Sequence, residues 1–494
     1  MFFVKSLNNF NIPYRSIKMR GRQISIKLQR IRYVATDLVT TAVAFFIFNI
    51  FRYFLMDVNG YMHLSIGEFL ELPKILTEQV LIPICLLGVY WLSGYYNDPF
   101  SRSRLEEVHI TLVSALINAI LIFFALLIND PLPARKLSYE LMGVLWSCLF
   151  LFTYIGRLLI TSSAIRHFEN RDWCFNTVII GDSPEAAEMA SRLENLQTKL
   201  GYHVIGHVPI EGETPRRSPL THLTHDQTER LCHNGSIDQI IIVPEQGSPE
   251  AKVLDLLFRY FRTGVPIRIA PTSLSFLTSN IRLNDIIAEP FIDLTSPAMN
   301  NWQKNMKRVI DVVLSGVALV VLSPLYLALA IAVKWSSPGP VIYRQERIGY
   351  RQKPFFIYKF RSMRTDAEAA GPQLSDEDDP RITHVGKFLR KYRFDELPQF
   401  WNVLKGDMSL VGPRPERAFF IEKIVREAPY YTLVHQVKPG ITSWGMVKFG
   451  YARTVAEMVE RTRYDLIYLS NMSVAVDFKI LLHTVKTVFT GKGI

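Results

Sequence analysis

The sequence predicts a membrane α-helical protein with four N-terminal transmembrane helices, a soluble Rossmann-like α/β domain and a mainly α C-terminal domain with a re-entrant membrane helix. Hydrophobic residues make up 49% of the 494 residues, and the mean hydropathy of +0.13 exceeds the usual soluble balance. Long apolar stretches precede residue 165, and strand and helix patterns alternate after residue 175. The expected units are a basic cytoplasmic N-terminus (1–33), the transmembrane block (34–165), the α/β domain (175–290), the re-entrant helix (305–334) and the C-terminal domain (335–494).

The basic residues behind the net charge of +11 concentrate beside apolar stretches. A nucleic-acid-binding surface would instead form a continuous basic stripe or patch. An anionic lipid surface attracts basic clusters that flank membrane segments. We therefore expect membrane lipids as partners and no nucleic acid. The four cysteines are scattered without metal-ligand spacing, so neither disulfides nor structural zinc are expected.

Four stretches approach the length that a membrane-crossing helix needs. They are residues 34–54, 80–96, 110–128 and 141–160. Lys and Arg gather before the first stretch and after the fourth, whereas the loop 57–79 is mostly acidic. This asymmetry predicts that both ends of the block are cytoplasmic. Asp37, Arg52 and Arg157 fall near the expected helix ends, where we expect them to reach the headgroup region.

Buried-strand and helix patterns alternate in the next segment. Residues 177–180, 237–243 and 265–269 are expected strands, and 183–195 is an expected helix. The first strand ends at Gly181-Asp182-Ser183, which begins like a dinucleotide fingerprint but lacks its later glycines. We therefore favour a regulatory or scaffolding domain over a dinucleotide site.

Residues 312–333 are uncharged and long enough to cross a bilayer. Ser323 and Pro324 interrupt the segment, and proline kinks a helix because it removes a donor and clashes with the preceding turn. Basic residues flank both ends, which favours both ends on the cytoplasmic face. We predict a re-entrant helix broken at Ser323 and Pro324, with a kinked spanning helix as the alternative.

Short motifs then follow one another to the C-terminus. They are Gly339-Pro340-Val341, Arg347-Ile348-Gly349, Tyr358-Lys359-Phe360-Arg361-Ser362-Met363, Asp395-Glu396-Leu397-Pro398-Gln399, Gly412-Pro413-Arg414-Pro415-Glu416 and Lys438-Pro439-Gly440-Ile441-Thr442. Phosphoryl transfer requires charge neutralisation, and guanidinium groups match phosphate geometry. The cations available for phosphate binding are Lys359, Arg361, Arg390, Arg393 and Arg414. Taken alone, Asp395 predicts the N-cap of a helix starting near Glu396, with Pro398 in its first turn.

This ordered set of motifs resembles the bacterial sugar transferase family of monotopic phosphoglycosyl transferases, from about residue 305 to the C-terminus. The preceding spans and α/β domain resemble the long form of the family, which primes exopolysaccharide, capsule or O-antigen assembly. The resemblance implies transfer of a sugar 1-phosphate from a UDP-sugar to polyprenyl (undecaprenyl) phosphate, with release of UMP. It also implies a catalytic domain on the cytoplasmic face of the bacterial inner membrane, and it makes a homodimer plausible.

The resemblance also implies residue roles. The carboxylate matching Asp395 attacks the sugar-bearing phosphorus and forms a covalent phosphosugar intermediate. Glu396 matches a residue associated with Mg²⁺, an ion that commonly binds through one or two carboxylates and substrate phosphates. Lys359 and Arg414 match positions implicated in activity, and Pro415 belongs to the expected substrate-binding set.

Three further segments carry expectations. Asp379-Pro380-Arg381 fits the family's Asp-x-Arg pattern, whereas the acidic residues 376–378 are expected in a solvated loop. Residues 444–453 depart from the commoner family wording Trp-Ala-Gln-Val-Asn-Gly-Arg, and Arg453 is a candidate substitute for the displaced arginine. Residues 466–489 predict one amphipathic helix, either on the membrane surface or packed against the domain.

Two other functions remain open at this point. One is an NAD-dependent nucleotide-sugar dehydratase or epimerase centred on the α/β domain, which the absent glycines disfavour. The other is a non-catalytic scaffold for polysaccharide assembly. The sugar is hidden because discrimination between epimers depends on a few hydrogen bonds. Glucose and galactose are the leading candidates, from the resemblance alone.

Overall fold

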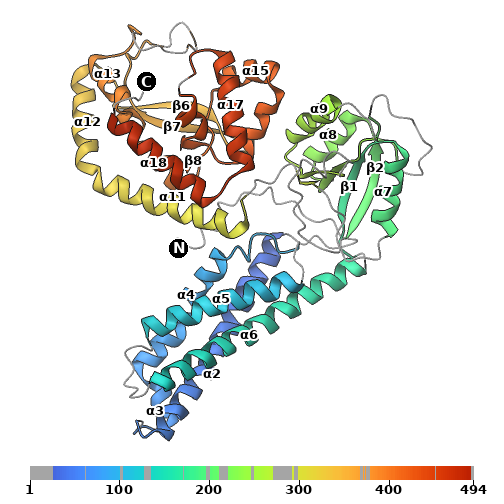
Figure 1. Cartoon of the computed structure of the whole chain (residues 1–494), viewed down its shortest axis with the longest axis vertical. Coiled ribbons are helices and arrows are strands. Elements are labelled where there is room, and N and C mark those ends of the chain that lie inside the picture. The colour runs from blue at the N-terminus through green and yellow to red at the C-terminus, as the bar shows by residue number, and fades with distance from the viewer. Residues whose placement is uncertain are drawn as a thin grey trace.

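The computed structural model describes residues 26–61, 63–100, 104–126, 135–170, 172–195, 201–210, 221–245, 250–270, 292–293, 299–367, 371, 373, 379–450 and 452–490. Figure 1 shows three parts: an elongated block of helices, an α/β domain, and a larger C-terminal domain with α11 along its lower edge. Most of the basic N-terminal segment and the acidic residues 376–378 lie outside the described residues.

The described part of the N-terminal block contains five helices. They are α2 (Ile26–Val58), α3 (Ile66–Glu71), α4 (Pro73–Leu92), α5 (Arg104–Ala125) and α6 (Arg135–Glu169). All except α3 are long and apolar enough to cross a membrane, which confirms the four expected spans as helices. The second span differs in its bounds, because α4 ends at Leu92 and Gly94 has a φ of +80° in the turn that follows. Tyr95 and Tyr96 therefore belong to that turn.

The expectation that Asp37 and Arg157 reach the headgroups is wrong. Both side chains are 0% exposed, and Nη2 of Arg157 lies 2.6 Å from Oδ2 of Asp37. They lie well inside α2 and α6, where an apolar surrounding makes pairing more favourable than separate burial of two charges. Arg52 is also buried, and its Nη1 lies 3.4 Å from Oε2 of Glu78.

The α/β domain contains a five-stranded sheet in the order β2-β1-β3-β4-β5. Its strands are β1 (Phe175–Ile180), β2 (Tyr202–Val208), β3 (Gln239–Ile242), β4 (Ile267–Ile269) and β5 (Ile292–Asp293). The first four pair in parallel, and β5 pairs antiparallel with β4. Helices α7 (Pro184–Asn195), α8 (His225–His233) and α9 (Glu250–Phe261) connect the strands. The three expected strands and the expected helix are present; β2 and β5 were not expected.

The C-terminal domain begins with two consecutive apolar helices, α11 (Asn301–Val321) and α12 (Ser323–Ser336). They meet at an angle of 63° at Leu322. The bend coincides with the expected break, because Pro324 lies in the first turn of α12, where its missing N–H costs least. Whether this pair re-enters the membrane or crosses it stays a prediction.

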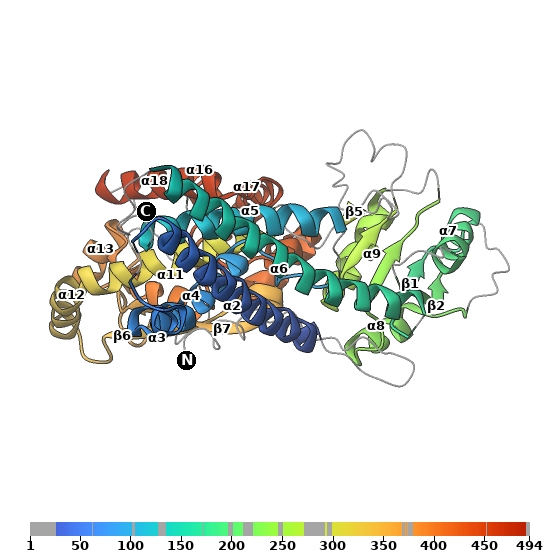
Figure 2. The same cartoon turned by 90° about the horizontal axis from the view of Figure 1, so that it is seen from below.

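The rest of the domain is mainly helical, with two small sheets. Strands β6 (Ile342–Ile348) and β7 (Pro354–Phe360) form an antiparallel hairpin, and β8 (Ser409–Val411) pairs in parallel with β9 (Gly440–Thr442). The helices are η2 (Tyr350–Gln352), α13 (His384–Lys391), η3 (Phe394–Glu396), α14 (Gln399–Lys405), α15 (Ala418–Glu427), η4 (Pro429–Gln436), α16 (Trp444–Lys448), α17 (Val455–Ser470) and α18 (Val474–Thr490). Seen from below in Figure 2, α11 crosses beneath this domain.

The prediction of one helix over 466–489 is wrong. The structure breaks it between Ser470 and Val474, where Ser473 Oγ accepts the N–H of Val476 as a new helix starts. Helix α18 packs against the domain, and a contact of its outer face with the membrane stays a prediction. Asp477 is buried against Lys307, whereas Leu482 is exposed on its outer face.

Candidate active site

Asp395 and Glu396 lie in the short 3-10 helix η3, directly after α13. Arg393 adopts a left-handed conformation with a φ of 57°, which turns the chain before the acid pair. The N–H of Glu396 donates to the carbonyl of Arg393 at 3.2 Å and closes this turn. The predicted N-cap role of Asp395 is therefore wrong, because α14 starts only at Gln399 and its N-cap residue is Pro398.

The two carboxylates are buried, with Asp395 7% and Glu396 5% exposed. Lys359 reaches them from β7, with Nζ 2.7 Å from Oε1 of Glu396 and 3.9 Å from Oδ2 of Asp395. Arg414 approaches from the loop after β8, and its Nη2 lies 3.1 Å from the same Glu396 oxygen. Because a charge is costly to bury without partners, these cations make the buried acid pair tenable.

The surroundings shift the two acids in opposite directions. Burial acts to raise the pKa of Glu396, but the positive charges of Lys359, Arg414 and Arg393 outweigh it and hold that pKa far below its usual range. Burial raises the pKa of Asp395, and the charges of Lys359, Arg390 and Arg414 offset this only in part while Glu396 adds to it. Neighbouring acids with separated pKa values are typical of catalytic pairs.

Four of the five expected phosphate-binding cations contribute charge at the acid pair. Lys359 and Arg414 contact Glu396 directly, and Arg390 and Arg393 act on the pair through their charge. Arg390 is oriented by Ser362, whose Oγ accepts from its Nε at 3.0 Å. A positively charged rim of this kind stabilises the charge that develops during phosphoryl transfer.

Arg361 and Pro415 point elsewhere in the structure. The Nη2 of Arg361 donates to the carbonyl of Ser337 at 2.6 Å, and its Nη1 donates to that of Pro338 at 3.1 Å, just past the end of α12. A cation at this end satisfies free carbonyls and complements the helix dipole. The carbonyl of Pro415 accepts from Nη1 of Arg347 at 3.0 Å.

A second ion cluster is centred on the buried Glu416, two residues after Arg414. Glu416 lies between two cations, with Oε2 3.1 Å from Nη1 of Arg347 and Oε1 2.6 Å from Nη2 of Arg461. On the same helix α17 as Arg461, Asp465 accepts the N–H of Gly445 at 3.0 Å. Sequence reasoning assigned no role to these residues. Arg347 and Glu416 lie within motifs and could have been found, whereas nothing local marks Arg461.

The atypical segment 444–453 touches this site through Met446, whose Sδ lies 3.5 Å from Nη1 of Arg414. Arg453 is exposed, and its backbone N–H donates to Glu457. The Asp-x-Arg pattern forms a local ion pair, with Nη2 of Arg381 2.6 Å from Oδ2 of Asp379.

The carboxylates of the acid pair have the chemistry that a Mg²⁺ ion shared with substrate would need. Among the described residues, no group of three or more His, Cys, Asp or Glu side chains could hold a metal alone. Mg²⁺, however, typically binds one or two carboxylates and takes its other ligands from phosphates and water. Asp395 and Glu396 supply such carboxylates, and the low pKa of Glu396 keeps it ionised.

Comparison with known proteins identifies the family of the chain. The family model described as bacterial sugar transferase matches residues 302–491. A UDP-glucose:undecaprenyl-phosphate glucose-1-phosphate transferase of Escherichia coli (strain K12) is 33% identical over 424 residues, which cover 84% of this chain and 89% of that protein. The chain belongs to the bacterial sugar transferase family. It is therefore an enzyme of the transferase class.

Other relatives show how much of the chain the similarity covers. A UDP-N-acetylgalactosamine-undecaprenyl-phosphate N-acetylgalactosaminephosphotransferase of Aeromonas hydrophila is 45% identical over 188 residues, but these cover only 38% of this chain and 44% of that protein. An uncharacterized sugar transferase of Haemophilus influenzae is 28% identical over 480 residues, or 91% of this chain and 96% of that protein. The likeness to this transferase thus extends over nearly the whole chain, including the transmembrane block and the α/β domain.

Proposed function

We propose that this protein transfers a sugar 1-phosphate from a UDP-sugar to undecaprenyl phosphate, releases UMP, and thereby starts the assembly of a surface polysaccharide. The observation that carries the proposal is the buried acid pair, whose members have opposite pKa shifts within a rim of four cations. The names of the relatives support the same reaction class.

In the first half-reaction, an Oδ of Asp395 attacks the sugar-bearing phosphorus of the UDP-sugar. A bond forms between this oxygen and phosphorus, the bond to the UMP oxygen breaks, and UMP leaves with that electron pair. The product is a mixed anhydride between Asp395 and the sugar phosphate. Such a covalent intermediate divides one difficult transfer between two anions into two easier steps.

In the second half-reaction, a phosphate oxygen of undecaprenyl phosphate attacks the same phosphorus. The bond to Asp395 breaks, the carboxylate is regenerated, and the lipid carries a diphosphate-linked sugar. Lys359 and Arg414 hold Glu396, and together with Arg390 they place positive charge where both phosphates must meet. Mg²⁺ held by Glu396 and Asp395 would neutralise further phosphate charge when bound.

The bent pair α11–α12 supports a re-entrant insertion from the cytoplasmic side of the inner membrane. Near the start of the pair, Lys307 binds Asp477 of α18, and at its end Arg361 binds carbonyls that follow α12, so both ends contact the same domain. Trp302 and Trp335 at the two ends are 47% and 85% exposed. Tryptophan favours membrane–water interfaces, so each end of the pair suits such an interface. That both ends contact the same domain favours one interface over two.

The sugar can be identified by offering a panel of UDP-sugars to the full-length protein in membranes with undecaprenyl phosphate and Mg²⁺. UDP-glucose and UDP-N-acetylgalactosamine come first because the relatives' names include them, and UDP-galactose follows. We expect one of them to give a lipid-linked sugar and UMP in equal amounts. If no UDP-sugar gives either product, the proposed function is wrong.

A further inference from the structure

The turn after α4, which we call the docking turn (residues 93–98), joins the transmembrane block to α11. Asn305 of α11 is fully buried against it, with Nδ2 donating to the carbonyl of Trp91 at 2.5 Å and Oδ1 accepting from Nδ2 of Asn97 at 3.3 Å. One helical turn earlier, Asn301 donates to Oδ2 of Asp98 at 2.8 Å. A Cβ on Gly94 would lie 2.6 Å from that of Asn301, so only glycine permits this approach.

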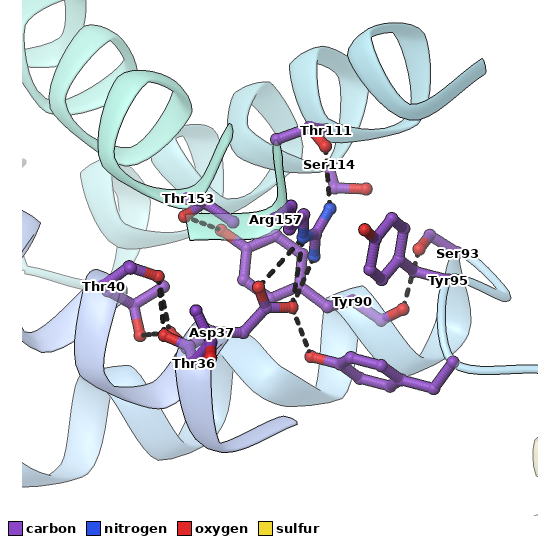
Figure 3. Close-up of polar contacts among 12 residues, drawn as sticks. Thr36, Asp37, Thr40, Tyr90, Ser93, Tyr95, Thr111, Ser114, Thr153 and Arg157 are labelled. Carbon is purple, nitrogen blue, oxygen red and sulfur yellow. Dashed lines mark hydrogen bonds and ion pairs between the residues drawn. The ribbon is translucent and has the colours of Figure 1, made fainter. Parts of the chain in front are cut away.

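The docking turn is held from the other side by the polar core of the transmembrane block. The hydroxyl of Tyr96 donates to Oδ2 of Asp37 at 2.7 Å, and the hydroxyl of Tyr95 donates to Oε1 of Glu107 at 2.7 Å. The guanidinium of Arg157 lies 3.6 Å from the centre of the Tyr95 ring. Figure 3 shows Arg157 reaching toward Asp37 with Tyr90 and Tyr95 beside it. Both tyrosines of the turn are thus fixed by buried partners.

The ion pair itself ties helices that lie far apart in sequence. The Nε of Arg157 donates to Oδ1 of Asp37 at 2.9 Å, and its Nη1 donates to Thr111 of α5 at 2.9 Å. Removing one partner of such a pair leaves an uncompensated buried charge, so α2, α5 and α6 are held in one arrangement. The docking turn is therefore held in a fixed position relative to the membrane spans.

The same short stretch of α11 also contacts the catalytic elements. Two residues after Asn305, Nζ of Lys307 donates to the carbonyl of Val411 at 2.9 Å, at the end of β8. Nη1 of Arg308 donates to the carbonyl of Val403 at 2.7 Å. Val403 lies in α14, which starts three residues after Glu396. The segment between Asn305 and Arg308 therefore links the docking turn to the helix beside the acid pair.

We propose that the docking turn, through Asn305 and Tyr96, fixes the depth of α11 and of the acid pair relative to the membrane, and that this positioning serves the lipid acceptor specifically. The inference rests on the proposed function. The UDP-sugar arrives from water, so its reaction with Asp395 tolerates a change in depth. The acceptor phosphate is held at the depth of the headgroups, so its attack does not. Asn305 and Tyr96 are positioning residues, since neither touches the acid pair in any contact described above.

The test compares the two half-reactions in full-length protein in lipid nanodiscs. Asn305→Ala removes the hydrogen bonds to Asn97 of the docking turn and to Trp91 at the end of α4. We expect the KM for undecaprenyl phosphate to rise about fivefold or more, as for the loss of about one hydrogen bond's free energy. UMP release without acceptor should keep its wild-type rate. Tyr96→Phe removes only the bond to Asp37 and should shift the same KM in the same direction by less. Asn471→Ala is the matched control, because the amide of Asn471 donates within its own helix end, at 2.9 Å to the carbonyl of Ile467.

An acceptor KM equal to that of Asn471→Ala in both variants would overturn the inference. An equal loss of UMP release and of transfer to the lipid acceptor would overturn it too, because a general structural defect impairs both half-reactions. If Asn305→Ala does not accumulate in membranes, Tyr96→Phe decides by the same comparison. Absence of UMP release in the wild-type protein would instead refute the proposed function on which the inference rests, and so the two failures are distinguishable.

Discussion

The Nζ of Lys359 lies 2.7 Å from Oε1 of Glu396. The same amine lies 3.9 Å from Oδ2 of Asp395, so one cation pairs closely with one acid and acts on the other only through its charge. This asymmetry keeps Glu396 ionised and leaves Asp395 with a raised pKa, less strongly engaged and open to react.

Replacing Lys359 with Met should therefore impair catalysis in the protein that still folds. The substitution leaves Glu396 with one fewer partner and removes a positive charge that stabilises the transition state. We therefore expect the rate of UMP release to fall about 100-fold or more. Lys405→Met is the control, because Lys405 is exposed and pairs with Asp407 at the surface. Equal rates in the two variants would show that Lys359 has no role in the reaction.

The raised pKa of Asp395 predicts an acid limb in the pH profile of UMP release. Because only the carboxylate is a nucleophile, the rate should fall as the pH drops through a value above the ordinary aspartate pKa of about 4. In Lys359→Met the limb should move to still higher pH, since the positive charge of Lys359 lowers this pKa. A rate that stays constant down to about pH 4 would contradict the assignment.

Substitution of Arg361 can distinguish a structural role from a role in phosphate binding. The bonds of Arg361 to the carbonyls of Ser337 and Pro338 predict that Arg361→Ala destabilises the fold by roughly 2 kcal/mol, because the carbonyls after α12 lose a charged donor. The midpoint of thermal unfolding should fall accordingly. The KM for the UDP-sugar should remain unchanged in the folded fraction. A raised KM at unaltered thermal stability would favour direct phosphate binding instead.

The topology of α11–α12 can be tested with a cysteine in place of Ser336, in a chain whose four native cysteines are replaced by serine. A re-entrant pair predicts labelling by a membrane-impermeant maleimide only after the inner membrane is opened. His63→Cys, between α2 and α3, should react in intact spheroplasts and serves as the periplasmic control. Labelling of both positions in intact spheroplasts would show that the pair crosses the membrane.

The sequence anticipated features that depend on local pattern. The four spans follow from uninterrupted apolar runs, and the bend at Leu322 follows from the neighbouring Pro324. Asp395, Glu396, Lys359 and Arg414 were found because each lies in a motif, and the structure brings them together.

Features that depend on distant contacts could not be read from local pattern. Asp37 and Arg157 are 120 residues apart, so their pairing emerges only when α2 packs on α6. The N-cap prediction for Asp395 failed because Arg393 adopts a positive φ that its residue type does not announce. The break after Ser470 was missed although Ser473 is a typical N-cap residue. The apolar pattern continues through both α17 and α18 and therefore resembles that of one helix.

The most direct test of the central claim is UMP formation by purified full-length protein given a UDP-sugar and Mg²⁺ without any lipid acceptor. If Asp395 is the nucleophile, the wild-type protein releases a burst of UMP stoichiometric with enzyme, and Asp395→Asn releases none above background. The control Asp366→Asn, at an exposed aspartate outside the acid pair, should give the full burst. Undiminished UMP release by Asp395→Asn would contradict the covalent mechanism.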